Sequence, residues 1–277
     1  MPKINYGLIV SDFDGTLVKR NGEIPLKNKE AIEKYIADGG KFAISTGRMH
    51  YGILSRAQEL GLQGAISCCQ GAVIIDAQSG ELLLNGTLDN ATTVAVCRKM
   101  EELNLHIHLY GDKEYYSNMD DDALKAYEEA VRMKATLVTD KPLSKFVEET
   151  GISAYKLLVM IEPSKVPQVI QELEKAGFAG CEITQSAKFL VEVINAKYSK
   201  GTAVEFLAKY YGVPLEKTIA VGDQLNDVPM IQKAGLGIAV KNADERLKRQ
   251  AVVINYTNED GAIAEIIQKY AYREEEI

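Results

Sequence analysis

The chain has 277 residues, a formal net charge of −7 and 46% hydrophobic residues. This length suffices for one large domain or two medium domains, each with its own core. The acidic balance argues against a nucleic-acid partner, no apolar run approaches the ~18 residues of a membrane span, and residues 1–5 lack a signal-peptide pattern. We therefore expect a cytoplasmic protein with neither nucleic-acid nor membrane partners.

Strand-like and helix-like segments alternate through the first part of the chain. An apolar strand over 6–10 is followed by helical spacing over 25–36, which Gly39 and Gly40 end. A strand over 41–44 and a helix ending near Gly61 come next. This βαβ order predicts a parallel sheet with helices on its faces.

The middle of the chain, from about residue 88 to residue 194, has a different order. Helices are predicted over 90–103, 121–133, 143–149 and 166–176, and strands over 105–109, 115–118, near 137, and over 156–161, 181–184 and 189–193. The last two strands lie close enough to pair antiparallel across 185–188. The simplest explanation is an α+β module inserted into an α/β sheet.

The alternation of helices and strands returns near the C-terminus. It predicts helices over 200–211 and 227–234, strands over 218–221 and 236–240, and finally an apolar 252–254 and a last helix. Both ends of the chain are expected to build one sheet. The predicted domains are therefore a core over 1–86 and 195–277 and an inserted domain over 87–194.

The cysteines and histidines of the middle segment do not predict a metal site. The 4 cysteines have no zinc-ligand spacing and are expected to be buried thiols. His106 and His108 alternate with apolar residues, so both should lie on one face of a strand. A metal pair there is disfavoured because no third ligand lies nearby.

Two carboxylates, Asp12 and Asp14, follow the first predicted strand. Because side chains alternate along a strand, both are expected to converge where the chain leaves the sheet, while Phe13 turns into the core. Carboxylates this close repel each other unless a divalent cation neutralises them, and oxygen ligands suit Mg2+. The alternative is an ordinary Asx turn, which would need only one of the two residues.

Three further segments place polar groups at predicted strand ends or helix starts. The run Ser45-Thr46-Gly47-Arg48 opens a helix, where backbone N–H groups can hold an anion. Lys200 opens another helix, and Gly222-Asp223-Gln224-Leu225-Asn226-Asp227 follows an apolar strand. A helix cap and a surface lysine would explain the first two separately. Together with the Asp12 segment they predict a site at the carboxyl ends of parallel strands.

These four segments resemble the ordered motifs of the haloacid dehalogenase (HAD) superfamily of phosphatases. The stretches 193–203, 222–235 and 258–261 resemble its Cof-type branch, whose α+β cap lies between the second and third motifs. The resemblance implies a parallel, Rossmann-like core sheet with an inserted α+β cap. One departure is Gln70-Gly71-Ala72, where Cof-type proteins usually have Asn-Gly-Ala; it concerns a substrate-side contact.

The resemblance also implies roles for individual residues. Asp12 would attack phosphorus and form an aspartyl-phosphate, and Asp14 would act as general acid and base. Mg2+ would be held by the Asp12 carboxylate, the Asp14 backbone carbonyl and Asp223, with Asp227 behind them. The phosphoryl oxygens would be bound by Thr46, Lys200, Asn226 and the backbone amides of Phe13 and Gly47. Arg48 would face the cap or the substrate.

The predicted function is a Mg2+-dependent phosphomonoesterase acting on small phosphorylated metabolites, with sugar phosphates first and flavin or pyridoxal phosphates next. Two alternatives stay open: a phosphomutase that reuses the aspartyl-phosphate, and a non-catalytic metal-binding regulatory protein on the same fold. The inserted domain is expected to act as a mobile lid that sets specificity, with hinges near 85–87 and 195–197. Neither the substrate nor the oligomeric state follows from the sequence.

Overall fold

The computed structural model describes residues 3–59 and 61–273. The chain divides into two compact units, one formed by Met1–Leu84 with Tyr198–Ile277 and the other by Asn85–Lys197. The sequence-based domain bounds were 86/87 and 194/195, and the roles of the two units as catalytic core and cap stay predictions. In the described ranges, no helix has the length and apolar character needed to cross a membrane.

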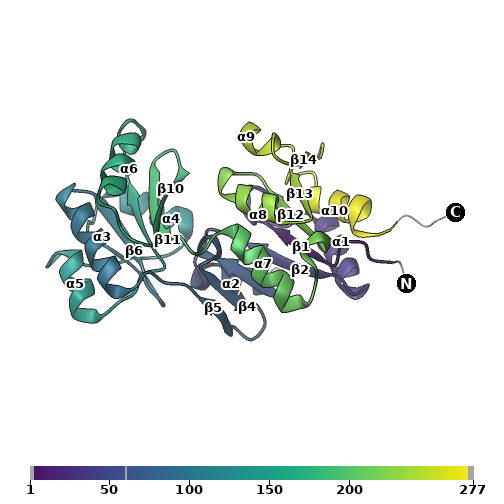
Figure 1. Cartoon of the computed structure of the whole chain (residues 1–277), viewed down its shortest axis with the longest axis horizontal. Coiled ribbons are helices and arrows are strands. Elements are labelled where there is room, and N and C mark those ends of the chain that lie inside the picture. Colours follow the sequence, from purple (N-terminus) through teal and green to yellow (C-terminus); the bar gives the residue numbers. More distant parts are fainter. Residues whose placement is uncertain (1–2, 60, 274–277) are drawn as a thin grey trace. The chain divides into compact units, whose positions relative to one another are not determined.

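The first unit is built on a sheet whose strands follow the order β14-β13-β12-β1-β2-β3-β4-β5 (Figure 1). The bounds are Leu8–Ser11 (β1), Lys41–Ser45 (β2), Ala65–Cys68 (β3), Val73–Asp76 (β4), Leu82–Asn85 (β5), Thr218–Gly222 (β12), Leu236–Ala239 (β13) and Val252–Val253 (β14). The central strand β1 pairs in parallel with β2 and β12, whereas β4 is antiparallel to β3. The predicted α/β fold with a largely parallel sheet is confirmed, and the antiparallel addition at β4 was not predicted.

Helices connect and cover this sheet. They are α1 (Leu26–Ala37), α2 (His50–Glu59), α7 (Lys200–Tyr211), α8 (Val228–Lys233), α9 (Glu245–Lys248) and α10 (Ala262–Ile266). Helix α7 has the predicted bounds because Ser199 caps its start reciprocally with Thr202 and Gly212, with φ +66°, ends it. Helix α8 begins after a 3-10 turn over Leu225–Asp227, so it is shorter than expected. Helices α7 and α8 pack together, as do α1 and α10.

The second unit contains a sheet in the order β10-β11-β9-β6-β7-β8. Its strands are His106–Tyr110 (β6), Tyr115–Ser117 (β7), Thr136–Leu137 (β8), Lys156–Met160 (β9), Cys181–Ala187 (β10) and Leu190–Asn195 (β11), and its helices are Asn90–Glu102 (α3), Asp122–Val131 (α4), Leu143–Thr150 (α5) and Val166–Lys175 (α6). The predicted antiparallel pairing of β10 with β11 is confirmed. The predicted turn over 185–188 is wrong: β10 continues with a register shift to Ala187, which leaves Phe189 in the turn and 47% exposed.

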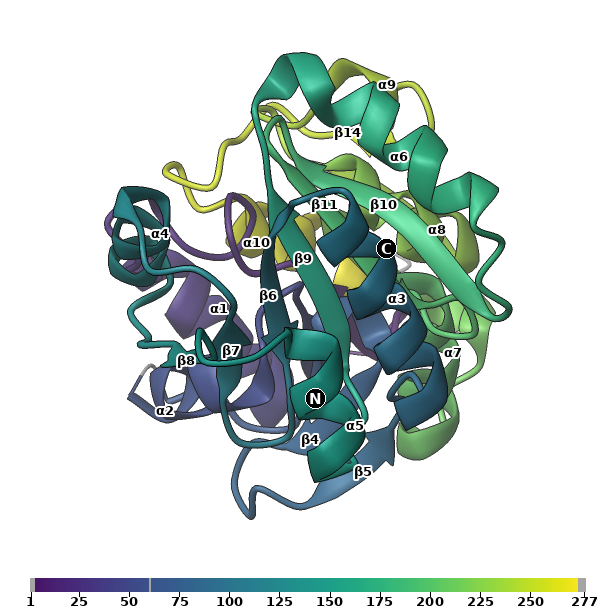
Figure 2. The same cartoon turned by 90° about the vertical axis from the view of Figure 1, so that its left-hand side faces the viewer.

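The two faces of this second sheet differ in chemistry. Helices α3, α5 and α6 lie over the face seen in Figure 2, and their aliphatic side chains form a core with Ile107 and Leu109 of β6. The alternate residues of β6 include His106 and His108, which are buried as a pair, with 3.2 Å between their Nε2 atoms. Burial lowers the pKa of His108 to about 3. The prediction that both histidines share one face is confirmed.

The cysteines are free thiols, as the sequence predicts. Cys68, Cys69 and Cys97 are buried, and Cys181 is partly buried. Burial raises the pKa of the Cys181 thiol to about 11. Burial raises the pKa of the Cys68 and Cys97 thiols as well, so these two and Cys181 are protonated near neutral pH and are not prepared nucleophiles.

Candidate active site

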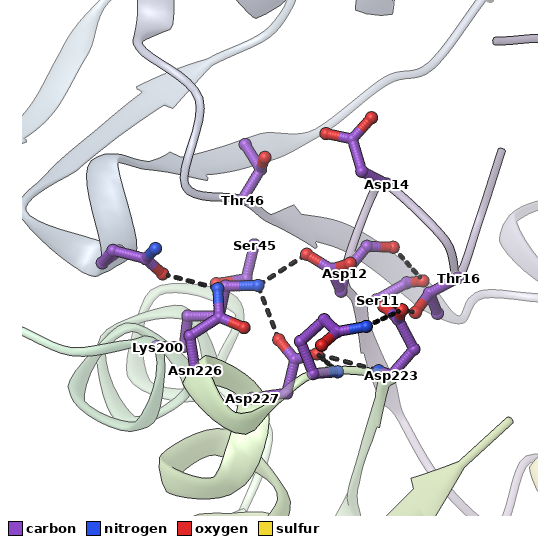
Figure 3. A network of polar contacts seen from close by, with 12 residues as sticks. Ser11, Asp12, Asp14, Thr16, Ser45, Thr46, Lys200, Asp223, Asn226 and Asp227 are labelled. Carbon is purple, nitrogen blue, oxygen red and sulfur yellow. Dashed lines mark hydrogen bonds and ion pairs between the residues drawn. The ribbon is translucent and has the colours of Figure 1, made fainter. Parts of the chain in front are cut away.

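Polar side chains from four segments of the first unit meet at one edge of its sheet (Figure 3). Asp12 follows β1, Thr46 follows β2, Asp223 follows β12, and Lys200 is the first residue of α7. Neighbouring parallel strands end at the same edge, so β12, β1 and β2 deliver their following residues to one place. The structure thus brings together these four residues, which the sequence motifs had singled out.

Lys200 lies at the centre of the site. Its side chain is 1% exposed, and its Nζ donates to Asp12 Oδ1 at 2.5 Å and to Asp227 Oδ1 at 2.6 Å. Burial by itself would lower the pKa of Lys200, but the two carboxylates outweigh it and hold this pKa above its ordinary value. Lys200 is therefore a buried, charged ammonium, and its charge is compensated on two sides.

Asp12, Asp223 and Asp227 form a buried carboxylate cluster. Their ligand atoms all lie within 4.8 Å of one another. Burial raises the pKa of Asp12, against the opposing effect of Lys200, and burial also raises the pKa of Asp223. Three carboxylates face a single ammonium here, so the cluster has an excess of negative charge that a cation would neutralise. An all-oxygen set of this kind fits Mg2+ better than a softer metal ion.

Hydrogen bonds fix the orientation of the two carboxylates that follow β12. Asp227 Oδ2 accepts the backbone N–H groups of Asp223 and Gln224 at 2.8 Å and 3.0 Å. Asp223 accepts from the Thr16 hydroxyl through Oδ1 and from the Gln224 side-chain amide through Oδ2, both at 3.0 Å. The other Asp227 oxygen, Oδ1, accepts from Lys200 Nζ. Asp227 is therefore placed to fix the loop that follows β12 and to orient Asp223.

Asp14 does not join this cluster, and the expected convergence of its carboxylate with that of Asp12 is wrong. Figure 3 shows the carboxylate of Asp14 turned away from Asp12, and it is 51% exposed. Arg48 Nε donates to Oδ2 at 2.7 Å and Arg48 Nη2 donates to Oδ1 at 2.9 Å. A two-pronged pair with a guanidinium compensates this carboxylate, whereas facing Asp12 would add another negative charge to the cluster. Phe13 is buried, as predicted.

Thr46, Gly47 and Asn226, three of the predicted phosphate-binding residues, lie around Gln70. Thr46 is buried, and its Oγ1 accepts the backbone N–H of Arg48 at 3.2 Å. Asn226 Nδ2 donates to Gln70 Oε1 at 3.1 Å. In the sequence, Gln70 stood out as a departure from the Asn-Gly-Ala pattern, at a position where the resemblance implies a substrate-side contact. Its contact with Asn226 joins residues far apart in the chain, so no local pattern could have indicated it.

Comparisons with known proteins extend over nearly the whole chain. A model of the haloacid dehalogenase-like hydrolases matches residues 9–267. The chain is 30% identical to Phosphatase YwpJ of Bacillus subtilis (strain 168), over 94% of this chain and 98% of that protein. It is 27% identical to the 5-amino-6-(5-phospho-D-ribitylamino)uracil phosphatase YwtE of the same organism, over 94% of this chain and 96% of that protein.

Solved structures share the fold across both units. The structure of a haloacid dehalogenase-like hydrolase from B. subtilis superposes with a TM-score of 0.84 at 26% identity, and the match covers 95% of this chain and 99% of that one. A haloacid dehalogenase-like hydrolase from Bacteroides thetaiotaomicron gives a TM-score of 0.81 at 28% identity, over 95% and 99%. The inserted α+β segment is therefore present in these proteins as well as the sheet that carries Asp12.

Proposed function

This chain belongs to the haloacid dehalogenase-like hydrolases, in their Cof-type branch, and from that membership we propose that it is a Mg2+-dependent phosphatase of small phosphorylated metabolites. Sugar phosphates are the first substrate class to test. One similar protein is named for a substrate whose phosphate is on a ribityl chain, which supports sugar-like esters as candidates.

The observation that carries the proposal is the buried contact of Lys200 with Asp12 at 2.5 Å. A carboxylate beside a buried ammonium stays available as an anionic nucleophile, and the same ammonium can bind an oxygen of the phosphoryl group. Thr46, Asn226 and the backbone amides of Phe13 and Gly47 are the further donors in this proposal. Such donors act strongly in a site from which water is excluded.

The Asp12 and Asp223 carboxylates and the backbone carbonyl of Asp14 would hold Mg2+, with Asp227 keeping Asp223 in position. When bound, the ion supplies the positive charge that allows an anionic carboxylate to approach an anionic phosphate ester. The excess of carboxylates over ammonium in the cluster supports this assignment.

Two steps complete the proposed reaction. In the first, an Asp12 oxygen bonds to phosphorus, the bond from phosphorus to the ester oxygen breaks, and the leaving oxygen takes a proton from Asp14. In the second, water gives a proton to Asp14 and bonds to phosphorus, and the bond to Asp12 breaks, so that phosphate leaves and both residues regain their initial state. Because Asp14 is paired with Arg48 in this structure, it must turn from Arg48 toward the phosphoryl group to act.

A phosphate-release assay tests the proposal. Wild-type protein with Mg2+ should hydrolyse p-nitrophenyl phosphate and part of a panel of phosphorylated metabolites. Asp12→Asn keeps the side-chain volume but removes the nucleophile, so turnover should fall roughly 10³-fold or more while the circular dichroism spectrum is unchanged. Asp140→Asn, at an exposed position of the second unit, is the matched control and should be as active as wild type.

The possible outcomes separate the alternatives. Activity of Asp12→Asn within tenfold of wild type would contradict covalent catalysis by Asp12. Transfer of phosphate to a second position of a sugar would identify a mutase. Mg2+ binding by wild type without turnover on any ester would favour the regulatory alternative.

A further inference from the structure

A strained turn lies beside the proposed phosphate-binding residues. The 3-10 turn over Cys69–Gly71 joins β3 to β4, and φ is +50° at Cys69, +58° at Gln70 and +101° at Gly71. Residues other than glycine rarely adopt this left-handed backbone conformation, and it persists only where the surrounding structure imposes it. Here the Cys69 N–H donates to Arg48 O at 2.9 Å and the Gln70 N–H donates to Thr46 O at 3.2 Å. The turn is therefore tied to the segment after β2.

The same turn packs against the start of α7. A Cβ atom added to Gly71 would lie 2.1 Å from the backbone oxygen of Ser199, the residue that caps the helix before Lys200. No side chain fits in that space, so glycine at position 71 allows the close approach. The backbone of Gln70 is thus fixed between the segments that carry Thr46 and Lys200.

The side chain of Gln70 has a donor that no neighbour uses. Gln70 is 7% exposed, and its Oε1 accepts from Asn226 Nδ2 at 3.1 Å. Its Nε2 lies 2.7 Å from the place that a Cβ of Gly47 would occupy. Over 3–59 and 61–273, no group accepts a hydrogen bond from this Nε2. This Nε2 is not among the described buried side-chain atoms that lack a partner, so solvent reaches it and a bound ligand can take the place of water there.

We propose that Gln70 is a further phosphate-binding residue, whose Nε2 donates to a phosphoryl oxygen while its Oε1 holds Asn226. This inference deepens the proposed function and rests on it. The ligand class is a phosphate monoester or inorganic phosphate, bound between Gly47 and Asn226. The carboxamide suits this position because it supplies a donor without adding a second buried positive charge beside Lys200.

Two substitutions of Gln70 test the contact. Gln70→Glu keeps the shape and an acceptor for Asn226 but replaces the donor with a negatively charged oxygen. Gln70→Asn keeps the amide, shortens the reach by one methylene and tolerates the left-handed backbone well. The affinity for inorganic phosphate in Mg2+ is measured by isothermal titration calorimetry, which needs no turnover. We expect it to weaken about 10-fold in Gln70→Asn and about 100-fold or more in Gln70→Glu.

Gln250→Glu is the matched control. Gln250 also takes part in an amide pair, since its Oε1 accepts from Gln232 Nε2 at 2.8 Å, and it lies exposed in the same unit. The substitution changes the net charge by the same amount as Gln70→Glu, but phosphate affinity should stay within twofold of wild type. This comparison separates the loss of a contact from a change in overall charge.

The Asn226→Ala variant distinguishes direct contact between Gln70 and phosphate from an indirect effect of Gln70 on Asn226. In Asn226→Ala, the further change Gln70→Asn should still weaken phosphate binding several-fold. If it has no effect there, Gln70 acts only on Asn226 and direct contact is excluded. The inference would also be overturned if Gln70→Glu and Gln70→Asn both fold and bind phosphate within threefold of wild type. That result would leave the proposed function intact if wild type hydrolyses esters normally. Wild type that binds phosphate but hydrolyses no ester would instead refute the proposed function.

Discussion

Replacing Lys200 by Met gives the most direct test of the electrostatics at the site. The ammonium is 1% exposed and lies 2.5 Å from Asp12 and 2.6 Å from Asp227. Methionine fills a similar volume but leaves two buried carboxylates without their counter-charge. Removal of one partner from a buried ion pair costs about 3–5 kcal/mol, so the free energy of unfolding in EDTA at pH 7.5 should fall by that amount.

The stability difference between Lys200→Met and wild type should also depend on pH, in a direction that follows from the pKa of Asp12. Burial already raises the pKa of Asp12, and Lys200 opposes that rise. Without Lys200 the pKa of Asp12 in the folded protein rises further above its value in the unfolded chain, so the folded state binds more protons between the two values. Stability of the variant relative to wild type should therefore be lowest at neutral pH and recover as the pH falls toward 5.

Urea unfolding in EDTA at pH 7.5 and pH 5.0 measures both effects. Lys233→Met is the control, because Lys233 pairs with Glu205 at 2.7 Å but both side chains are more than 40% exposed, and such pairs contribute little. Adding Mg2+ should restore part of the stability of Lys200→Met, since a cation can replace the missing charge. A loss below about 1 kcal/mol, or a pH profile parallel to that of wild type, would refute the assignment of Lys200 as the counter-charge of the cluster.

Three further predictions address the metal, the second unit and specificity. EDTA should abolish hydrolysis of p-nitrophenyl phosphate and Mg2+ should restore it, whereas full activity in metal-free buffer would contradict the proposed Mg2+ site. Because burial lowers the pKa of His108 to about 3, the unfolded chain binds the extra proton below pH 6.5, and stability should fall by about 2 kcal/mol between pH 6.5 and pH 5. Urea unfolding should show this slope in wild type, and it should flatten in His108→Gln. Exchange of residues 87–194 for the matching segment of a related phosphatase should change the substrate ranking in the phosphate-release panel but leave the dependence on Asp12; a folded chimaera with the parent's ranking would place specificity elsewhere.

Local signals in the sequence predicted the elements whose ends are fixed by nearby residues. Helix α7 is the clearest example, since Ser199 and Gly212 define its bounds through contacts within the helix itself. Strands β3, β4 and β5 were not predicted, because strands of only four residues are defined by their pairing more than by their own pattern. The prediction of the turn between β10 and β11 failed for a similar reason, because a shift in the pairing register moved the turn toward the C-terminus.

The candidate site also has features that the sequence could predict and features that it could not. Asp12, Asp223 and Lys200 could be placed together from the sequence, because residues that follow parallel strands meet at one edge. The pairing of Asp14 with Arg48 could not, since it depends on where a turn with φ +81° at Gly15 directs the chain. Alternation along an extended strand, which predicted convergence with Asp12, no longer applies once the backbone enters that turn.

The charge distribution around Lys200 gives a reason to assign chemistry here that is independent of family resemblance. Asp12, Asp223 and Asp227 are buried, and one ammonium lies among them. Such an arrangement lowers the stability of the fold relative to apolar side chains of the same size. Hydrogen bonds from Thr16 and Gln224 fix the positions of the carboxylates but do not cancel their charge. A bound cation would do so, and this is the physical basis for expecting metal binding and phosphate chemistry at the same edge of the sheet.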